Sequence, residues 1–268
     1  MGQNTKIDWA DDSINFAVGC HETTNPGCKE CYAIHRMLPA TMNLSPGTVR
    51  RTGEETWKKP LRWQEQLAQT GQTRTVFGNS LGDFFHKELD DYRTDAWDII
   101  RRTPNLIWII LTQRPGNILS RLPADWDTGY PNVWLGVSAS DQQHIDKRVP
   151  TLLRVPAALH LVSLEPLVNA VTIRDWLKPN DKGRKIGWVI TGGMSSKRWK
   201  MYRLYPSWVR TLRDECLAAQ TPFFFKQLGG PPENYRDGAQ AVLDGQLWKQ
   251  IPAATNQPVT LPSQAALL

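Results

Sequence analysis

The sequence contains few cysteines and no long hydrophobic stretch. Only four cysteines occur among its 268 residues, too few for the disulfide framework of a secreted protein. No apolar run approaches the roughly 18 residues of a membrane-spanning helix. The N-terminal segment, MGQNTKIDWADDS, is polar and acidic, which is unlike a signal peptide. These absences predict a cytoplasmic protein, kept in a reducing compartment and without a membrane partner.

The composition favours a large buried core and an anionic partner. Hydrophobic residues make up 40% of the chain and include twelve tryptophans, and the formal net charge is +6. An excess of Lys and Arg suits nucleic acid, a nucleotide or another phosphate-bearing substrate. Many proteins that bind none of these carry a similar charge, so charge alone leaves the partner open.

Seven short apolar segments, each bounded by turn residues, predict β-strands. They are nearly continuous rather than alternating, which is typical of strands buried on both faces. The predicted strands are Ser13–Val18, Arg74–Gly78, Leu106–Leu111, Val133–Val137, Leu159–Leu164, Gly187–Thr191 and Pro222–Phe225.

Amphipathic segments between these strands predict helices, among them Asp91–Arg102, Asp141–Arg154 and Pro206–Ala219. Alternating strands and helices indicate α/β architecture with parallel strands. We expect a single-domain, partial or complete parallel (β/α) barrel of about six to eight units over residues 1–230. An open doubly wound sheet is the alternative. Residues 231–268 are interpreted as a C-terminal extension ending in an extended tail.

Polar residues follow most of the predicted strands. The C-terminal ends of barrel strands meet at one rim, where active sites form. Helix N-capping is the alternative for each residue. The rim candidates are Asn79, Ser80, Asp83, Gln113, Arg114, Ser138, Ser140, Glu165, Gly192, Gly193, Met194 and Lys226.

Three cysteines, Cys20, Cys28 and Cys31, lie together in the segment GCHETTNPGCKECYA after the first predicted strand. Three thiolates can hold a metal centre and leave one position open, as in a [4Fe–4S] cluster with a free iron. A zinc site with His21 or His35 as the fourth ligand is equally compatible with the spacing. Cys216 might complete a four-cysteine site, although its apolar helical surroundings favour a core thiol. Plain free or buried thiols are the remaining interpretation.

Many segments, in order, resemble the radical S-adenosylmethionine (SAM) superfamily, and more closely a phage and prophage branch with a three-cysteine motif. Two features depart from the usual pattern. Seven residues separate Cys20 from Cys28, where the superfamily commonly has three, and Met194 follows Gly193 where the branch commonly has glutamate. The matching segments are TKIDWADDSINFAVGC, NPGCKECYA, TVFGNSLGDFFH, LTQRP, WLGVSASDQQHIDKRVPTLLRVPA, HLVSLEPL, WVITGG and SWVRTLRDECLAAQTPFFFKQLG.

The resemblance implies a barrel of radical SAM type in which the three cysteines hold a [4Fe–4S] cluster and SAM binds the open iron. An electron from an external donor would split SAM and give a radical that takes hydrogen from the substrate. The cofactor would carry this chemistry while the protein orients it. The residues implied to bind SAM are Tyr32, Asn79, Ser80, Asp83, Ser138, Ser140, Arg148, Glu165, Gly192 and Gly193; those implied at the substrate are Gln113, Arg114, Met194 and Lys226.

The predicted substrate is a modified nucleobase in phage DNA, altered by an isomerase-like hypermodification of a thymine-type base inside a bacterial host. The most basic and aromatic segment is KRWKMYRLY, in which Lys197, Arg198, Lys200 and Arg203 would contact the nucleic acid. Two alternatives stand beside it. One is a non-catalytic, zinc-stabilised nucleic-acid-binding protein, and the other is a radical SAM enzyme acting on a peptide or small metabolite.

Overall fold

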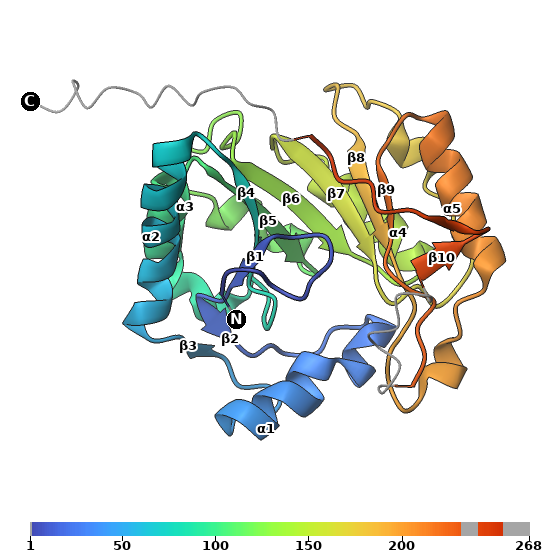
Figure 1. Ribbon diagram of the computed structural model, residues 1–268, viewed down its shortest axis with the longest axis horizontal. Helices are drawn as coiled ribbons and strands as arrows, with labels where there is room; N and C mark the ends of the chain where they lie inside the picture. Colours follow the sequence, from blue (N-terminus) through green and yellow to red (C-terminus); the bar gives the residue numbers. More distant parts are fainter. Residues whose placement is uncertain (1, 232–240, 254–268) are drawn as a thin grey trace, which may run out of the picture.

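The fold centres on one sheet of seven parallel strands, seen in a computed structural model that describes residues 2–231 and 241–253 (Figure 1). The strands lie side by side in chain order. They are β1 (Asp12–Ile14), β4 (Arg74–Gly78), β5 (Leu106–Thr112), β6 (Val133–Ser138), β7 (Leu159–Leu164), β8 (Ile186–Thr191) and β9 (Phe223–Phe225).

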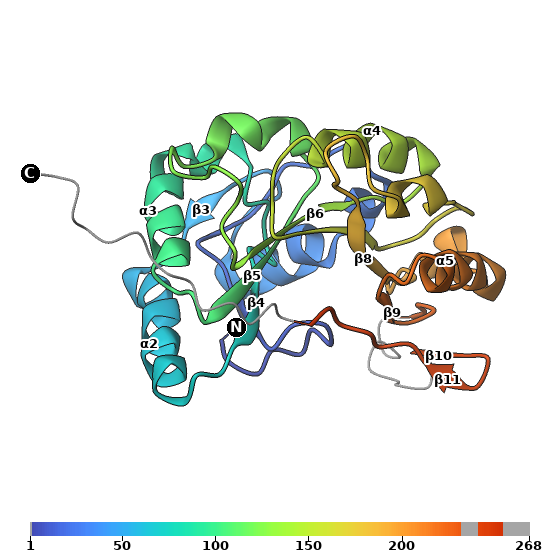
Figure 2. The ribbon, with the colours of Figure 1, turned by 90° about the horizontal axis from the view of Figure 1, so that it is seen from above.

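The strand order decides between the predicted architectures. A doubly wound sheet reverses its strand order at a switch point, whereas here the order never reverses. The sheet curls, with helices around its outside (Figure 2), and β1 and β9 form its two edges. The partial parallel (β/α) barrel is therefore confirmed, and the complete barrel and the doubly wound sheet are excluded.

The first predicted strand, Ser13–Val18, is wrong as a single element. β1 pairs in parallel with β4, whereas β2 (Ala17–Val18) leaves the sheet and pairs antiparallel with β3 (Arg50–Arg51). Side-chain amides cause the break. The Phe16 amide donates to Asn79 Oδ1 at 3.0 Å, and the Leu81 amide donates to Asn15 Oδ1 at 2.7 Å. These bonds replace strand-to-strand pairing and direct the chain toward the cysteine segment.

Four longer helices cover the outer face: α2 (Glu54–Thr70), α3 (Asp90–Arg101), α4 (Gln142–Leu152) and α5 (Pro206–Ala218). The three predicted helices correspond to α3, α4 and α5. Asp141 is the N-cap of α4, accepting from the His144 amide, rather than its first residue. The short helical segments are α1 (Leu38–Met42), η1 (Pro26–Glu30), η2 (Ala33–Met37), η3 (Lys87–Leu89), η4 (Pro115–Asn117), η5 (Leu119–Arg121), η6 (Arg174–Leu177) and η7 (Trp199–Tyr202).

Both faces of the sheet are buried, which explains the continuous apolar pattern of the strands. On β5, Trp108 and Ile110 belong to the main hydrophobic cluster, which includes residues of the outer helices. Ile107 and Ile109 belong to a second cluster, which Trp9 joins from the N-terminal segment. Successive strand residues point to opposite faces, so each face receives its own apolar set.

The described part of the C-terminal extension is a hairpin of β10 (Val242–Leu243) and β11 (Gln246–Leu247). It packs on the domain: the Phe225 amide donates to the Trp248 carbonyl at 2.7 Å. Residues 232–240 and 254–268, including most of the predicted tail, lie outside the described residues. Within the described ranges, no helix has the length and apolar character needed to cross a membrane.

Candidate metal and cofactor site

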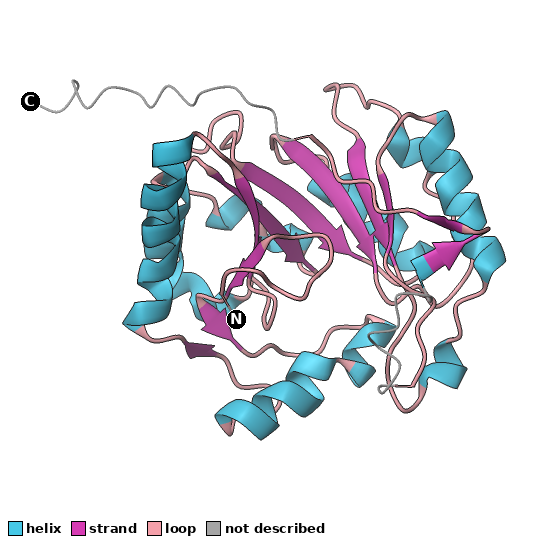
Figure 3. Cartoon of the chain, viewed as in Figure 1, coloured by secondary structure: helices cyan, strands magenta, loops and turns pink. Residues whose placement is uncertain are grey.

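The cysteine segment crosses the C-terminal rim of the sheet, below the arrowheads of the strands and on toward α1 (Figures 1 and 3). A bridge between Gly19 and Gly82 fixes its start. Its middle rests on the end of β7, because a Cβ on Gly27 would lie 2.6 Å from Pro166 Cδ. Only glycine allows this approach. The predicted Pro26–Gly27 turn thus seats the loop against the rim.

Two of the three cysteine sulfurs contact the end of β5. Cys28 is buried, with its Sγ 3.3 Å from Thr23 Oγ1 and 3.4 Å from Gln113 Oε1. Cys20 Sγ lies 3.5 Å from Arg114 Nη1. Burial raises the pKa of Cys20 to about 11, against the lowering effect of Arg114, and burial also raises the pKa of Cys31. Both thiols are therefore neutral at pH 7 unless a cation binds them.

The spacing of the sulfurs separates the two metal hypotheses. One zinc ion, at about 2.3 Å from each sulfur, holds three thiolates about 3.8 Å apart. The three cysteines, with or without His21 or His35, do not form a group of donor atoms within 4.8 Å of one another. A multi-iron cluster holds its thiolates farther apart than one ion does. The arrangement therefore fits a cluster better than the predicted Cys3His zinc site.

Two buried arginines flank the cysteines. Arg148 is 5% exposed and donates to the Ser138 carbonyl, and it forms no ion pair with a carboxylate of the described residues. Burial lowers its pKa, and the nearest opposing influence is Cys28. A buried cation beside a neutral thiol lacks compensation. Metal-bound thiolates would supply the missing negative charge, so the donor set fits an anionic iron–sulfur centre.

Asp83 organises the end of β5. Its carboxylate accepts from Thr112 Oγ1 at 2.7 Å, from the Gln113 amide at 3.0 Å, from Arg114 Nη1 at 2.8 Å and from the Phe85 amide at 3.0 Å. These four bonds fill the acceptor sites of a carboxylate. The geometry thus corrects two predictions: Asp83 pairs with Arg114 rather than with the ammonium group of SAM, and Arg114 faces the cysteine loop rather than a substrate anion.

The other predicted SAM-binding residues fall into two groups. Ser140 is fully buried and donates to Asn25 Oδ1, so it supports the cysteine loop and is not open to a ribose. Ser80 Oγ accepts from Asn15 at 3.1 Å. Asn79 has a left-handed backbone, and its buried Nδ2 has no hydrogen-bond partner among the described residues. Tyr32 is 50% exposed, directly after Cys31.

The end of β8 is closed by close packing. A Cβ on Gly193 would lie 1.9 Å from the Leu228 carbonyl oxygen, and one on Gly192 would lie 2.9 Å from Glu165 Oε1. Met194 is buried. Glu165 pairs with Lys226 at 3.3 Å. The packing alone explains both glycines, and the Glu165–Lys226 pair stands at the same rim as the cysteine loop.

Residues that sequence reasoning missed hold the cysteine loop from α4. His144 Nδ1 lies 2.7 Å from Asp141 Oδ1, and its Nε2 lies 3.1 Å from Thr24 Oγ1. Asn25 caps η1, the turn that carries Cys28, by accepting from the Gly27 amide. The strand–Asp–helix pattern around Asp141 signals a cap, but no sequence signal joins His144 to a loop 120 residues earlier.

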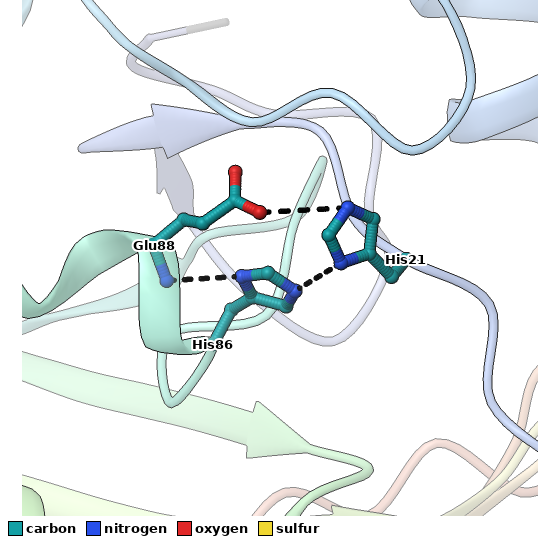
Figure 4. Close-up of side chains that lie close together, drawn as sticks. All are labelled: His21, His86 and Glu88. Carbon is teal, nitrogen blue, oxygen red and sulfur yellow. Dashed lines mark hydrogen bonds and ion pairs between the residues drawn. The ribbon is translucent and has the colours of Figure 1, made fainter.

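A second group, His21, His86 and Glu88, has donor atoms within 4.8 Å of one another (Figure 4). Its hydrogen bonds assign the tautomers. His86 Nδ1 accepts from the Glu88 amide, so its Nε2 carries the proton that is donated to His21 Nδ1 at 3.1 Å. His21 Nε2 then donates to the Gly47 carbonyl. The ring nitrogens are satisfied by one another, and the group anchors the start of the cysteine loop instead of presenting free lone pairs to a metal.

The basic aromatic segment lies beside the cysteine loop. Its basic residues Lys197, Arg198, Lys200 and Arg203 are all exposed. Arg198 pairs at 3.3 Å with Glu30, a residue between Cys28 and Cys31. Cys216, in contrast, is buried on α5 within the main hydrophobic cluster, which contains none of the other cysteines. It is a core thiol, and burial raises its pKa.

These features define an α/β half-barrel protein with a three-cysteine loop across the C-terminal rim of its sheet. The chain belongs to the family described as protein of unknown function (DUF5131), which it matches over residues 4–252. No curated protein matches it.

Solved structures of spore photoproduct lyase are similar at low identity. The lyase complexed with dinucleoside spore photoproduct shares 12% identity and a TM-score of 0.49, over 80% of this chain and 63% of that one. A double mutant with bound AdoMet and dinucleoside spore photoproduct shares 12% identity and a TM-score of 0.48, over the same shares. A cysteine-to-serine mutant shares 13% identity and a TM-score of 0.47, over 75% and 61%. The chain spans about three fifths of the lyase's length.

Proposed function

We propose that this protein is a radical SAM enzyme that binds a [4Fe–4S] cluster through Cys20, Cys28 and Cys31. When bound, the cluster and SAM would supply an electron and a carbon radical able to remove a hydrogen atom from a substrate. The electron comes from an external donor. The neutral, buried thiols and their position at the C-terminal rim are consistent with a site that is completed by its cofactor.

The observation that carries the proposal is the pairing of buried guanidinium groups with the cysteine loop. Arg114 lies 3.5 Å from Cys20 Sγ, and buried Arg148 has no carboxylate partner among the described residues. Both charges favour an anionic metal–thiolate centre. Arg148 is also the best placed cation for the carboxylate of SAM.

The substrate is proposed from charge and surface. The net charge is +6, and four exposed basic residues with neighbouring aromatics flank the cysteine loop. Phosphates attract such a segment, and exposed aromatics stack on bases. We therefore favour a nucleobase in DNA, modified by an isomerase-like step on a thymine-type base of phage DNA within a bacterial cytoplasm. A base in a duplex must leave the stack to reach the rim.

Anaerobic reconstitution tests the cofactor. Iron and sulfide content, and electron paramagnetic resonance (EPR) of the reduced protein with and without SAM, are the measurements. About four irons per chain and a signal that SAM perturbs would support the proposal. Bound zinc without sulfide would refute it. The matched variants are Cys28→Ala, expected to lose iron, and Cys216→Ala, expected to retain it.

A separate experiment tests the DNA contact. Replacing Lys197, Arg198, Lys200 and Arg203 with Ala should weaken DNA binding and reduce its salt dependence by up to about four charges' worth of counterion release. A control variant carries four Lys or Arg to Ala changes on α2, at Lys58, Lys59, Arg62 and Arg51. Unchanged affinity in the first variant would indicate another substrate, such as a peptide or small metabolite.

A further inference from the structure

Two consecutive residues at the end of β5 contact two different cysteine sulfurs. Gln113 Oε1 lies 3.4 Å from Cys28 Sγ, and Arg114 Nη1 lies 3.5 Å from Cys20 Sγ. We propose that Gln113 and Arg114 are positioning residues that hold hydrogen-bond donors against the cluster-ligating sulfurs and thereby raise the reduction potential of the cluster. The inference rests on the proposed function and replaces the substrate role predicted for both residues.

Gln113 can serve Cys28 in both of its protonation states. In the neutral thiol, the S–H group donates to Gln113 Oε1, as does the Thr23 hydroxyl at 2.5 Å. A metal-bound thiolate only accepts. Turning the amide by half a rotation places its NH2 group where the oxygen stood, because the two ends have the same shape. That group then donates to Cys28 Sγ, and the Thr23 amide, 3.5 Å from the sulfur, adds a second donor.

Arg114 is held in place on the other side. Its Nη1 donates to Asp83 Oδ2 at 2.8 Å, and its Nη2 donates to the His21 carbonyl at 2.6 Å. Asp83 is itself fixed by Thr112 Oγ1 at 2.7 Å. With two anchors on one planar guanidinium, the contact to Cys20 Sγ is set by the fold rather than by a flexible side chain. The arginine has no spare reach for a substrate phosphate.

The effect on potential follows from charge. Reduction adds one electron, and therefore one negative charge, to the cluster and its sulfurs. Hydrogen bonds to the sulfurs and a nearby cation stabilise this charge and raise the potential. Loss of one such donor is expected to change the ratio of reduced to oxidised cluster about tenfold at a fixed potential, which equals about 59 mV for one electron.

The test is an EPR-monitored redox titration of the reconstituted full-length protein, with dithionite as reductant. Gln113→Leu removes the donor and keeps the bulk, and its potential should fall by about 59 mV. Gln113→Glu adds a negative charge and should lower it further. Arg114→Lys keeps the charge but cannot span both anchors and the sulfur, and should give a smaller fall. The exposed controls Gln66→Leu and Arg101→Lys should match the wild type.

The outcomes separate this inference from the proposed function. Iron content and the SAM-induced change in the EPR signal are measured first. Wild-type protein without a four-iron cluster overturns the proposed function, and the inference with it. A normal cluster whose potential is the same in Gln113→Leu, Gln113→Glu and the controls overturns the inference alone. If Arg114→Lys fails to fold, the two Gln113 variants still decide.

Discussion

Replacing Gly193 with Ala is expected to destabilise the fold strongly, without any role for a cofactor. The end of β8 and the segment after β9 approach backbone to backbone: the Gly193 amide donates to the Gln227 carbonyl at 2.8 Å. An added Cβ would lie 1.9 Å from the Leu228 oxygen and 2.5 Å from the Leu228 carbonyl carbon. Contacts below 3.0 Å do not persist, so the two segments must separate by at least about 1 Å.

The cost is estimated from overpacking. Inserting a methyl group into a tightly packed site costs about 1–3 kcal/mol, and backbone atoms yield less readily than side chains, so we expect the upper value, about 3 kcal/mol. For a chain of this size the urea slope is roughly 3 kcal/mol per molar. The midpoint of urea unfolding, followed by circular dichroism, should therefore fall by about 1 M.

Gly116→Ala is the matched control, because nothing lies within 4 Å of its added Cβ and its φ is ordinary. Its midpoint should change little. Equal midpoints for Gly193→Ala and Gly116→Ala would refute the packing argument and return Gly193 to the set of candidate cofactor-binding residues.

Three further predictions concern other regions. Cys28→Ala should lose most of its iron while Cys216→Ala keeps it and loses about 1 kcal/mol of stability, measured by metal analysis and urea unfolding. Asp12→Ala should cost about 2 kcal/mol by urea unfolding, since its buried carboxylate loses Arg74, bound at 2.7 Å, and the partial exposure of that arginine moderates the loss; a change below about 0.5 kcal/mol would contradict this. Hydrogen bonds from two arginines of α5, Arg210 first, lower the pKa of Asp244 from 3.8 to about 2. Ionised Asp244 thus holds the β10–β11 hairpin above pH 3.8, and this contribution is lost as the pH falls to about 2. The difference in tryptophan fluorescence between wild type and Asp244→Asn should vanish over that range, and a difference that persists to the acid end would count against the pairing.

Local sequence patterns were enough for most of the fold. The strands Arg74–Gly78 and Leu159–Leu164 have the predicted bounds, because buried parallel strands are short apolar runs with turn residues at both ends. The first strand failed for a tertiary reason. Asn15 and Asn79 exchange side-chain bonds with backbone groups more than 60 residues away, and no local pattern encodes a bond over that distance.

The sequence by itself determined the three-cysteine loop, the parallel half-barrel and the polar rim, because each depends on spacing, periodicity or residue type within a short window. The tertiary structure alone decided what the rim residues do. Asp83, a predicted ligand for SAM, binds Arg114; Ser140 supports Asn25; and Gln113 faces Cys28. These partners come from different strands and loops. A carboxylate or guanidinium binds whichever group the fold brings within hydrogen-bond distance, and only the curvature of the sheet determines which group that is.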